Sequence, residues 1–145
     1  MSGTVGETYL AALQHDIATL DGDERLVGVV RRPTGWFRSA VEENRPALGP
    51  PDDLLDEVQA ARERLKRHGL CDEGAHNAAW EETDFADRYR AHLEESDAAR
   101  EALADLADRV DAGEDVMLVC FEGEGKRCHR RLLAPALRER VERGH

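Results

Sequence analysis

Short apolar runs alternate with amphipathic helical patterns along this chain, and this order restricts its fold more than any other feature. RLVGVV (25–30) and VMLVC (116–120) have the length and composition of buried strands. Strands separated by helices are typical of a parallel sheet with helices on its faces. We therefore expect a small three-layer α/β fold with a mostly parallel sheet. The helical patterns lie at 7–20, between Asp52 and Gly69, at 83–94, at 96–113 and from about Cys128 to 141.

Two segments lack a clear pattern. Residues 34–51 are rich in glycine and proline, and we interpret them as a loop inside one domain because predicted strands lie on both sides. Residues 69–80 are interpreted as irregular chain. A length of 145 residues suits a single compact domain, so the expected unit is 1–145.

The charge balance restricts the class of partner. The chain has 31 Asp and Glu against 20 Lys and Arg, and its net charge is −11. Such an excess of carboxylates is tolerated best in high salt, so we predict an acidic surface of halophilic type. The same excess disfavours generic nucleic-acid binding. The N-terminal MSGTVGETYL carries no targeting pattern and no run is long enough to span a membrane, so we expect a cytoplasmic protein.

The cysteines are odd in number. Without a secretion signal, the three cysteines are interpreted as reduced thiols rather than as a disulfide framework.

The segment VCFEGEGKRCHRR (119–131) carries most of the candidate chemistry. A strand, a glycine-containing loop and a helix N-terminus form a cradle for an anion, and nearby arginines favour the thiolate. Ligands of parallel sheets bind beyond the carboxyl ends of the strands, where a second basic segment also lies. The candidate catalytic residues are Cys128, Cys120 and His129, and the candidate anion-binding residues are Arg130, Arg31, Arg32, Arg38 and Arg127.

Other interpretations of this segment stay open. The Cys-x5-Arg loop of cysteine phosphatases would need arginine where Lys126 stands, whereas a rhodanese-like sulfur carrier places looser demands on spacing. A purely structural role in anchoring the last helix is another reading. A metal site is a further alternative, with Cys120, Cys128 and His129 as ligands and Cys71, His68 or His76 as a fourth.

VMLVCFEGEGKRCHRRLLAPAL, preceded by WEETDFADRYRAHLEE, resembles the domain of unknown function 488 (DUF488) family. Its members end in an apolar strand, a short loop that often begins with cysteine and an acidic residue, and Cys-His-Arg opening a helix. VGVVRRP resembles the early strand of the family, although many members have Asp-Val-Arg there. The resemblance implies a three-layer α/β fold and no established activity. The matching residues here are Cys120, Glu122, Cys128, His129 and Arg130.

Two hypotheses of function follow. In the first, the protein is an enzyme that acts on a small anionic substrate through the Cys, His and Arg residues at the strand carboxyl ends. In the second, the same residues form a non-catalytic module that binds a metal, a nucleotide or a protein partner. The sequence names neither a cofactor nor an oligomeric state.

Overall fold

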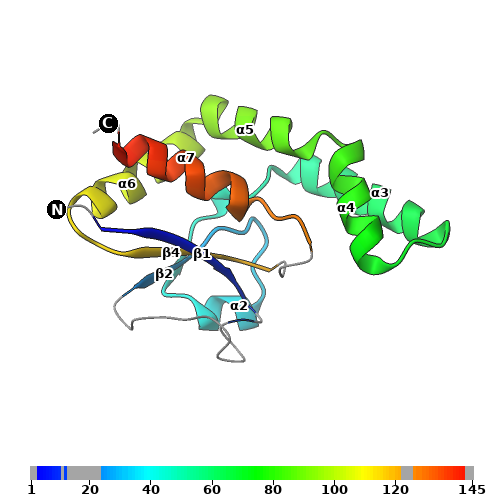
Figure 1. Ribbon diagram of the computed structural model, residues 1–145, viewed down its shortest axis with the longest axis horizontal. Helices are drawn as coiled ribbons and strands as arrows, with labels where there is room; N and C mark the ends of the chain where they lie inside the picture. Colours follow the sequence, from blue (N-terminus) through cyan, green and yellow to red (C-terminus); the bar gives the residue numbers. More distant parts are fainter. Residues whose placement is uncertain (1–2, 11, 13–23, 122–125, 143–145) are drawn as a thin grey trace.

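A computed structural model describes residues 3–10, 12, 24–121 and 126–142. Its centre is a sheet of four parallel strands in the order β1-β4-β2-β3 (Figure 1). Parallel neighbours require crossover connections, and helices supply those from β2 to β3 and from β3 to β4. The predicted parallel α/β fold is confirmed. The strands are β1 (Val5–Tyr9), β2 (Arg25–Gly28), β3 (Glu43–Asn44) and β4 (Val116–Cys120).

The strand register brings the four carboxyl ends to one edge of the sheet. Cys120 at the end of β4 pairs with Tyr9 at the end of β1, and Val119 pairs with Gly28 at the end of β2. Gly28 also pairs with Asn44 of β3. Whatever follows each strand therefore emerges at the same edge.

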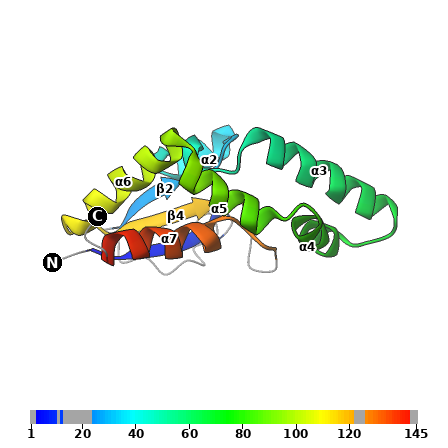
Figure 2. The ribbon, with the colours of Figure 1, turned by 90° about the horizontal axis from the view of Figure 1, so that it is seen from above.

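The helices form two layers and a projecting pair. α6 (Asp97–Asp111) and α7 (Arg130–Glu142) pack side by side over one face of the sheet, and α2 (Gly35–Ala40) lies on the other face (Figure 1). α3 (Asp52–Arg67) and α4 (Asp72–Glu82) pack mainly on each other and extend past the sheet edge (Figure 2). α5 (Phe85–Glu95) connects them to α6.

Local signals explain where these elements begin and end. The Ser96 hydroxyl caps α6 by accepting a hydrogen bond from the Ala99 N–H, and Gly113 ends the helix region with a positive φ of 106°. The buried faces of α6, α7 and β4 then meet in one apolar core, represented by Leu106, Leu118 and Leu133. No helix in the described part of the chain is long and apolar enough to cross a membrane.

Three predicted segments differ from the structure. Residues 7–9 belong to β1 instead of a helix, because they pair with the buried strand β4; residues 11 and 13–20 of that prediction lie outside the described residues. The segment 34–51 is not a plain loop, since it contains α2, β3 and a 3-10 turn at Pro46–Leu48. Residues 72–80 belong to α4, whose buried face is built from small and aromatic residues that give weak apolar periodicity.

Candidate functional site

A cavity of about 180 Å³ lies beyond the carboxyl ends of β2 and β4, where they face α3 and α4. Its lining includes the residues that directly follow β2 and the residues that directly precede α7. This is the position at which parallel sheets bind their ligands. Five of the predicted site residues line it: Arg31, Arg32, Arg127, Cys128 and His129.

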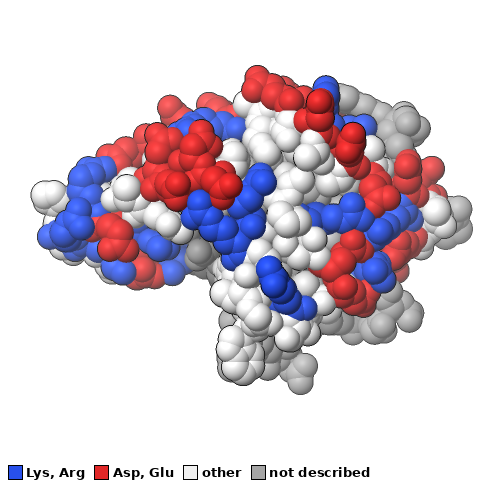
Figure 3. All heavy atoms as spheres, turned by 180° about the vertical axis from the view of Figure 1, so that it is seen from behind, with Lys and Arg blue, Asp and Glu red and all other residues white. Residues whose placement is uncertain are grey.

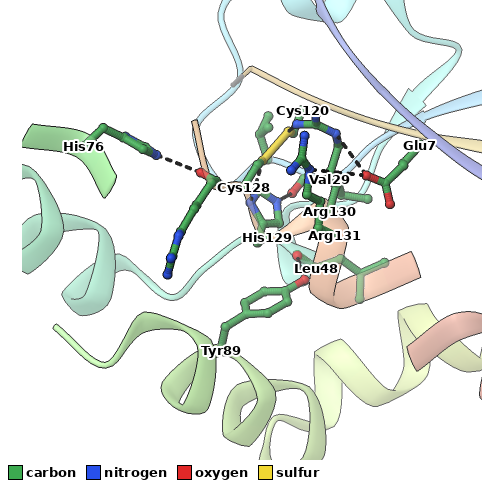
Figure 4. The surroundings of a disulfide bond; sticks show 12 residues. Glu7, Val29, Leu48, His76, Tyr89, Cys120, Cys128, His129, Arg130 and Arg131 are labelled. Atoms are coloured by element: carbon green, nitrogen blue, oxygen red, sulfur yellow. Dashed lines mark hydrogen bonds and ion pairs between the residues drawn. A yellow bond between two sulfur atoms is a disulfide. The ribbon is translucent and has the colours of Figure 1, made fainter. Parts of the chain in front are cut away.

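Cys120 and Cys128 form a disulfide, and both side chains are buried (Figure 4). The expectation of reduced thiols was therefore wrong for this pair; the end of β4 and the start of α7 bring the two sulfur atoms together although eight positions separate them. Only Cys128 of the pair lines the cavity. Cys71 is free and exposed, and its sulfur accepts a hydrogen bond from the Gly74 N–H at the start of α4.

His129 is a buried, neutral imidazole beside Cys128. Its Nε2–H donates to the Val29 carbonyl oxygen, which fixes the tautomer and leaves Nδ1 facing the Cys128 sulfur at 3.6 Å. Burial lowers the pKa of His129 to about 4; the Val29 hydrogen bond opposes this shift and the Arg130 charge adds to it. The edge of the Tyr89 ring lies against the imidazole, with ring centroids 5.4 Å apart.

Arg130 contacts the other cysteine, Cys120. Its Nη1–H donates to the Cys120 sulfur at 3.0 Å, and its Nε lies 3.6 Å from a carboxylate oxygen of Glu7 on β1 (Figure 4). The guanidinium also lies 5.4 Å from the centroid of the Tyr9 ring. Only 1% of Arg130 is exposed and it does not line the cavity, so the structure places this predicted anion-binding residue behind the site.

Arg31 and Arg32 reach the cavity with different partners. The Nε–H of Arg31 donates to the Pro50 carbonyl at 3.0 Å, and its Nη2 lies 3.3 Å from the Gly49 carbonyl. Any side chain at position 49 would collide with the Arg31 backbone, because a Cβ there would lie 2.3 Å from the Arg31 nitrogen. Arg32 instead pairs with Asp52 and with a second carboxylate one turn further along α3, Asp56.

Helix α4 holds the segment that precedes Cys128. His76 donates its Nε2–H to the Arg127 carbonyl at 2.7 Å, and the Asn77 side-chain oxygen accepts from the Arg127 N–H at 2.9 Å. The Arg127 side chain forms an ion pair with Glu81. These contacts fix the backbone at the entrance to α7. His76 had been considered as a metal ligand, and its role in the described structure is this backbone contact.

Arg38 is separate from the other predicted residues. It is exposed and lines a shallow hollow on the β3 side of the molecule, shared with Arg31 but not with either buried cysteine. As for the metal alternative, the described residues contain no group of three or more His, Cys, Asp or Glu side chains placed to share an ion.

Two polar residues of the cavity were missed, Gln59 and Arg62 of α3. They stand one helical turn from Leu55 and Val58, which also line the cavity. The sequence contained this signal, because the spacing of these four positions defines one stripe of the helix. The apolar spacing of Leu54, Val58, Ala61 and Leu65 predicts a neighbouring face of the helix, which shares only Val58 with the stripe that lines the cavity.

The cavity has an unusual charge for this protein. Four arginines line it, and among the described residues no aspartate or glutamate does. This contrasts with a chain that carries 31 acidic residues and a net charge of −11. The remaining lining is largely apolar, with Trp80, Phe85 and Phe121 as its aromatic members.

Comparison with known proteins identifies the family. A family model described as the active DUF488-N3 subclade, DUF488-N3a, matches residues 9–141. No curated protein and no solved structure matches the chain. The matched region includes β2 to β4 and all but the last residue of α7, and thus every predicted site residue. Because this match covers nearly the whole sequence, the chain belongs to the DUF488 family.

Proposed function

We propose that the protein is an enzyme that acts on a small anionic substrate in this cavity, with Cys128 as the reacting thiol. One observation carries the proposal: Cys128 and His129 line the same cavity as Arg31, Arg32 and Arg127, and no described carboxylate lines it. A nucleophile, a proton acceptor and an anion clamp are the parts that thiol chemistry on an anion requires.

The thiol acts after the disulfide is opened. A dithiol reductant supplies two electrons and two protons, and is itself oxidised to a disulfide while Cys120 and Cys128 become thiols. The lone pair of His129 Nδ1 then faces the Cys128 S–H. As the sulfur bonds to the substrate, the bond from the substrate to its leaving group breaks, and the S–H proton passes through Nδ1 to that leaving group. The charge of Arg130 next to Cys120 favours the thiolate of that residue once the disulfide is open.

The arginines orient the anion toward the sulfur. Arg31 is held by backbone carbonyls, so its positive charge is not neutralised by the groups that position it. Arg32 and Arg127 have exposed carboxylate partners, and exchanging such a partner for a bound anion costs little. All three cations therefore remain available to a ligand.

A second candidate function is a binding module without catalysis. The observation that favours it is the disulfide itself, because a bonded Cys128 offers no thiol to a substrate. The same arginines would then hold an anion that is not converted.

Alkylation of the reduced protein tests the proposal. The rate constants of iodoacetate, an anion, and of iodoacetamide, which is neutral, are measured for each cysteine by peptide mass spectrometry. We expect the iodoacetate-to-iodoacetamide ratio at Cys128 to exceed that at Cys71 by at least about fivefold, because the arginines attract the anionic reagent. Cys71 is the internal control, since it is exposed, free and outside the cavity lining.

The outcomes separate the two candidates. A raised ratio and ready alkylation at Cys128 support the enzyme. If Cys128 reacts no faster than buried Cys120 in the reduced protein, the thiol is not presented to the cavity and the catalytic proposal fails. If the ratio at Cys128 equals that at Cys71, the arginines do not act on an anion and both candidates fail.

A further inference from the structure

Arg62 is a cation of the cavity that the structure leaves without a described partner. It lies on α3 and lines the cavity beside Val58. Its Nε atom is buried and has no hydrogen-bond partner in the part of the chain that the structure describes. A buried donor of this kind costs free energy until an acceptor fills it. Arg62 also lines the cavity, so an anionic ligand there would offer acceptors to its guanidinium.

The neighbours of Arg62 on the same helix behave differently. Arg64 forms an ion pair with Glu82, and Lys66 forms one with Asp72. The carboxylates of this acidic chain thus reach two exposed cations of α3, although exposed Arg67 has no ion pair among the described residues. No ion pair to a described residue is formed by Arg62, whose position facing the cavity keeps it from them.

The aromatic lining of the cavity requires an apolar group in the ligand, in addition to the anionic group. Trp80 and Phe85 stack with ring centroids 3.8 Å apart, and both line the cavity with Phe121. A fully charged, strongly hydrated ion would leave these apolar faces without a partner. The ligand that fits both features has an anionic group and an apolar group.

The volume limits the size of the apolar group. The cavity measures about 180 Å³. An apolar protein cavity of about 150 Å³ holds one benzene molecule, whereas pockets for drug-sized ligands begin near 300 Å³. One ring with one small anionic substituent is therefore the largest ligand that the cavity takes without opening.

We propose that the ligand class is an anion bearing a single ring, with Arg62 and Arg31 on the anionic group and the aromatic lining on the ring. This inference rests on the proposed function, because it assigns the substrate class of the same cavity. Arg62 acts in it as a specificity-determining residue. Arginine suits this role because its planar fork binds phosphate-like and carboxylate groups through two hydrogen bonds.

Three probes separate the ring from the charge. Phenylphosphonate has both, methylphosphonate has the charge alone, and benzyl alcohol has the ring alone. Binding to the reduced full chain is followed by the fluorescence of Trp80 in a Trp36→Phe background, because these are the two tryptophans of the chain and Trp36 is exposed and outside the cavity. We expect phenylphosphonate to bind at least tenfold more tightly than either other probe.

Two variants locate the anionic group. Arg62→Met keeps the length and apolar character of the stem, and we expect it to weaken phenylphosphonate binding at least tenfold while benzyl alcohol binding stays within twofold. Arg64→Met is the matched control, two residues away on the same helix and 46% exposed, and it should change neither affinity by more than twofold.

The results distinguish this inference from the proposed function. Equal affinity for the two phosphonates overturns the ring requirement but leaves the anion site standing. An unchanged affinity of Arg62→Met for phenylphosphonate overturns the role of Arg62. If neither phosphonate binds nor slows the alkylation of Cys128, the proposed function fails together with the inference.

Discussion

Two regions of the molecule collect arginines, and they differ in what surrounds them. At the β3 edge of the sheet, Arg25, Arg45 and Arg109 all pair with Glu43. We call these four residues and Asp105, which pairs with Arg45 and Arg109, the edge cluster. In the cavity, no described carboxylate lines the site. The same residue type is therefore neutralised in one region and left with excess positive charge in the other.

This difference separates a structural role from a binding role. In the edge cluster, partial burial raises the pKa of Glu43, but hydrogen bonds from Arg109, Arg25 and Arg45 outweigh it and lower the pKa to about 2. The cluster is thus satisfied in the absence of any ligand. In the cavity, Arg32 and Arg127 pair with carboxylates outside the lining, whereas Arg31 and Arg62 have no described carboxylate partner, so an added anion can still relieve the repulsion between them.

Exposed arginines elsewhere in the described chain also pair with carboxylates, as those of the edge cluster do. On the face seen in Figure 3, acidic and basic side chains are interleaved over the described residues. The described exposed ion pairs include those of Arg88 with Glu57 and of Arg100 with Asp97. Most exposed pairs of this kind contribute at most about 1 kcal/mol each, so they can reorganise without unfolding the chain.

The largest expected effect on stability comes from the titration of His129, which lines the cavity. Its pKa is about 4 in the folded protein and about 6.5 in the unfolded chain, so the unfolded state binds more protons between these values. The contribution of neutral His129 to the free energy of unfolding should be fully present above pH 6.5. As the pH drops to 4, the free energy of unfolding should fall by up to about 3 kcal/mol. Urea unfolding at pH 7, 5.5 and 4 measures the fall.

His129→Gln is the matched variant for this prediction. A glutamine amide can keep the donor to the Val29 carbonyl but does not titrate. The slope of stability between pH 6.5 and 4.5 should therefore flatten in this variant. A slope equal to that of the unaltered protein would show that another group titrates there, and the assignment of a neutral His129 would fail.

The edge cluster gives the next largest effect. Glu43→Gln removes the carboxylate that three arginines share, and we expect it to lower the free energy of unfolding by about 2 kcal/mol at pH 7. Because the Glu43 pKa is lowered, its contribution is present above pH 4.5 and is lost as the pH falls toward 2. Denaturant titrations at pH 7 and pH 3 check both statements.

Glu42→Gln is the control for the edge cluster. Glu42 is 46% exposed and pairs only with Arg25 among the described ion pairs, so its loss should cost less than about 0.5 kcal/mol. Phenylphosphonate affinity should be unchanged in both variants. A loss of affinity in Glu43→Gln would connect the two regions and break the comparison.

Much of the site followed from the sequence because one topological rule sufficed. Once two buried parallel strands were predicted, the residues after them had to meet at one edge, and Arg31, Arg32, Cys128 and His129 do line one cavity there. The family was predictable for a related reason, since the strand and the Cys-His-Arg segment are contiguous in the chain.

The rest depended on tertiary contacts that no local pattern encodes. Helix α4 was missed because its buried positions are alanine, histidine and tryptophan rather than a periodic apolar stripe. The contact of His76 with the backbone before Cys128 was missed for the same reason. Glu7 was predicted to lie in a helix rather than in β1, so its ion pair with Arg130 could not be predicted. The disulfide was missed because the sulfur separation depends on how β4 and α7 meet.

The smallest expected effect is also the one that tests the comparison most directly. Arg45→Met should cost about 1 kcal/mol, because it breaks contacts with Glu43 and Asp105. Arg62→Met should leave the free energy of unfolding within about 0.5 kcal/mol or raise it, since a buried donor without a described partner is removed. At one ligand concentration, phenylphosphonate should then stabilise Arg45→Met more than Arg62→Met, because the stabilisation grows with the affinity of the fold for the ligand. If Arg62→Met loses more than about 1 kcal/mol without ligand, Arg62 is a structural residue like those of the edge cluster, and the division between the two regions disappears.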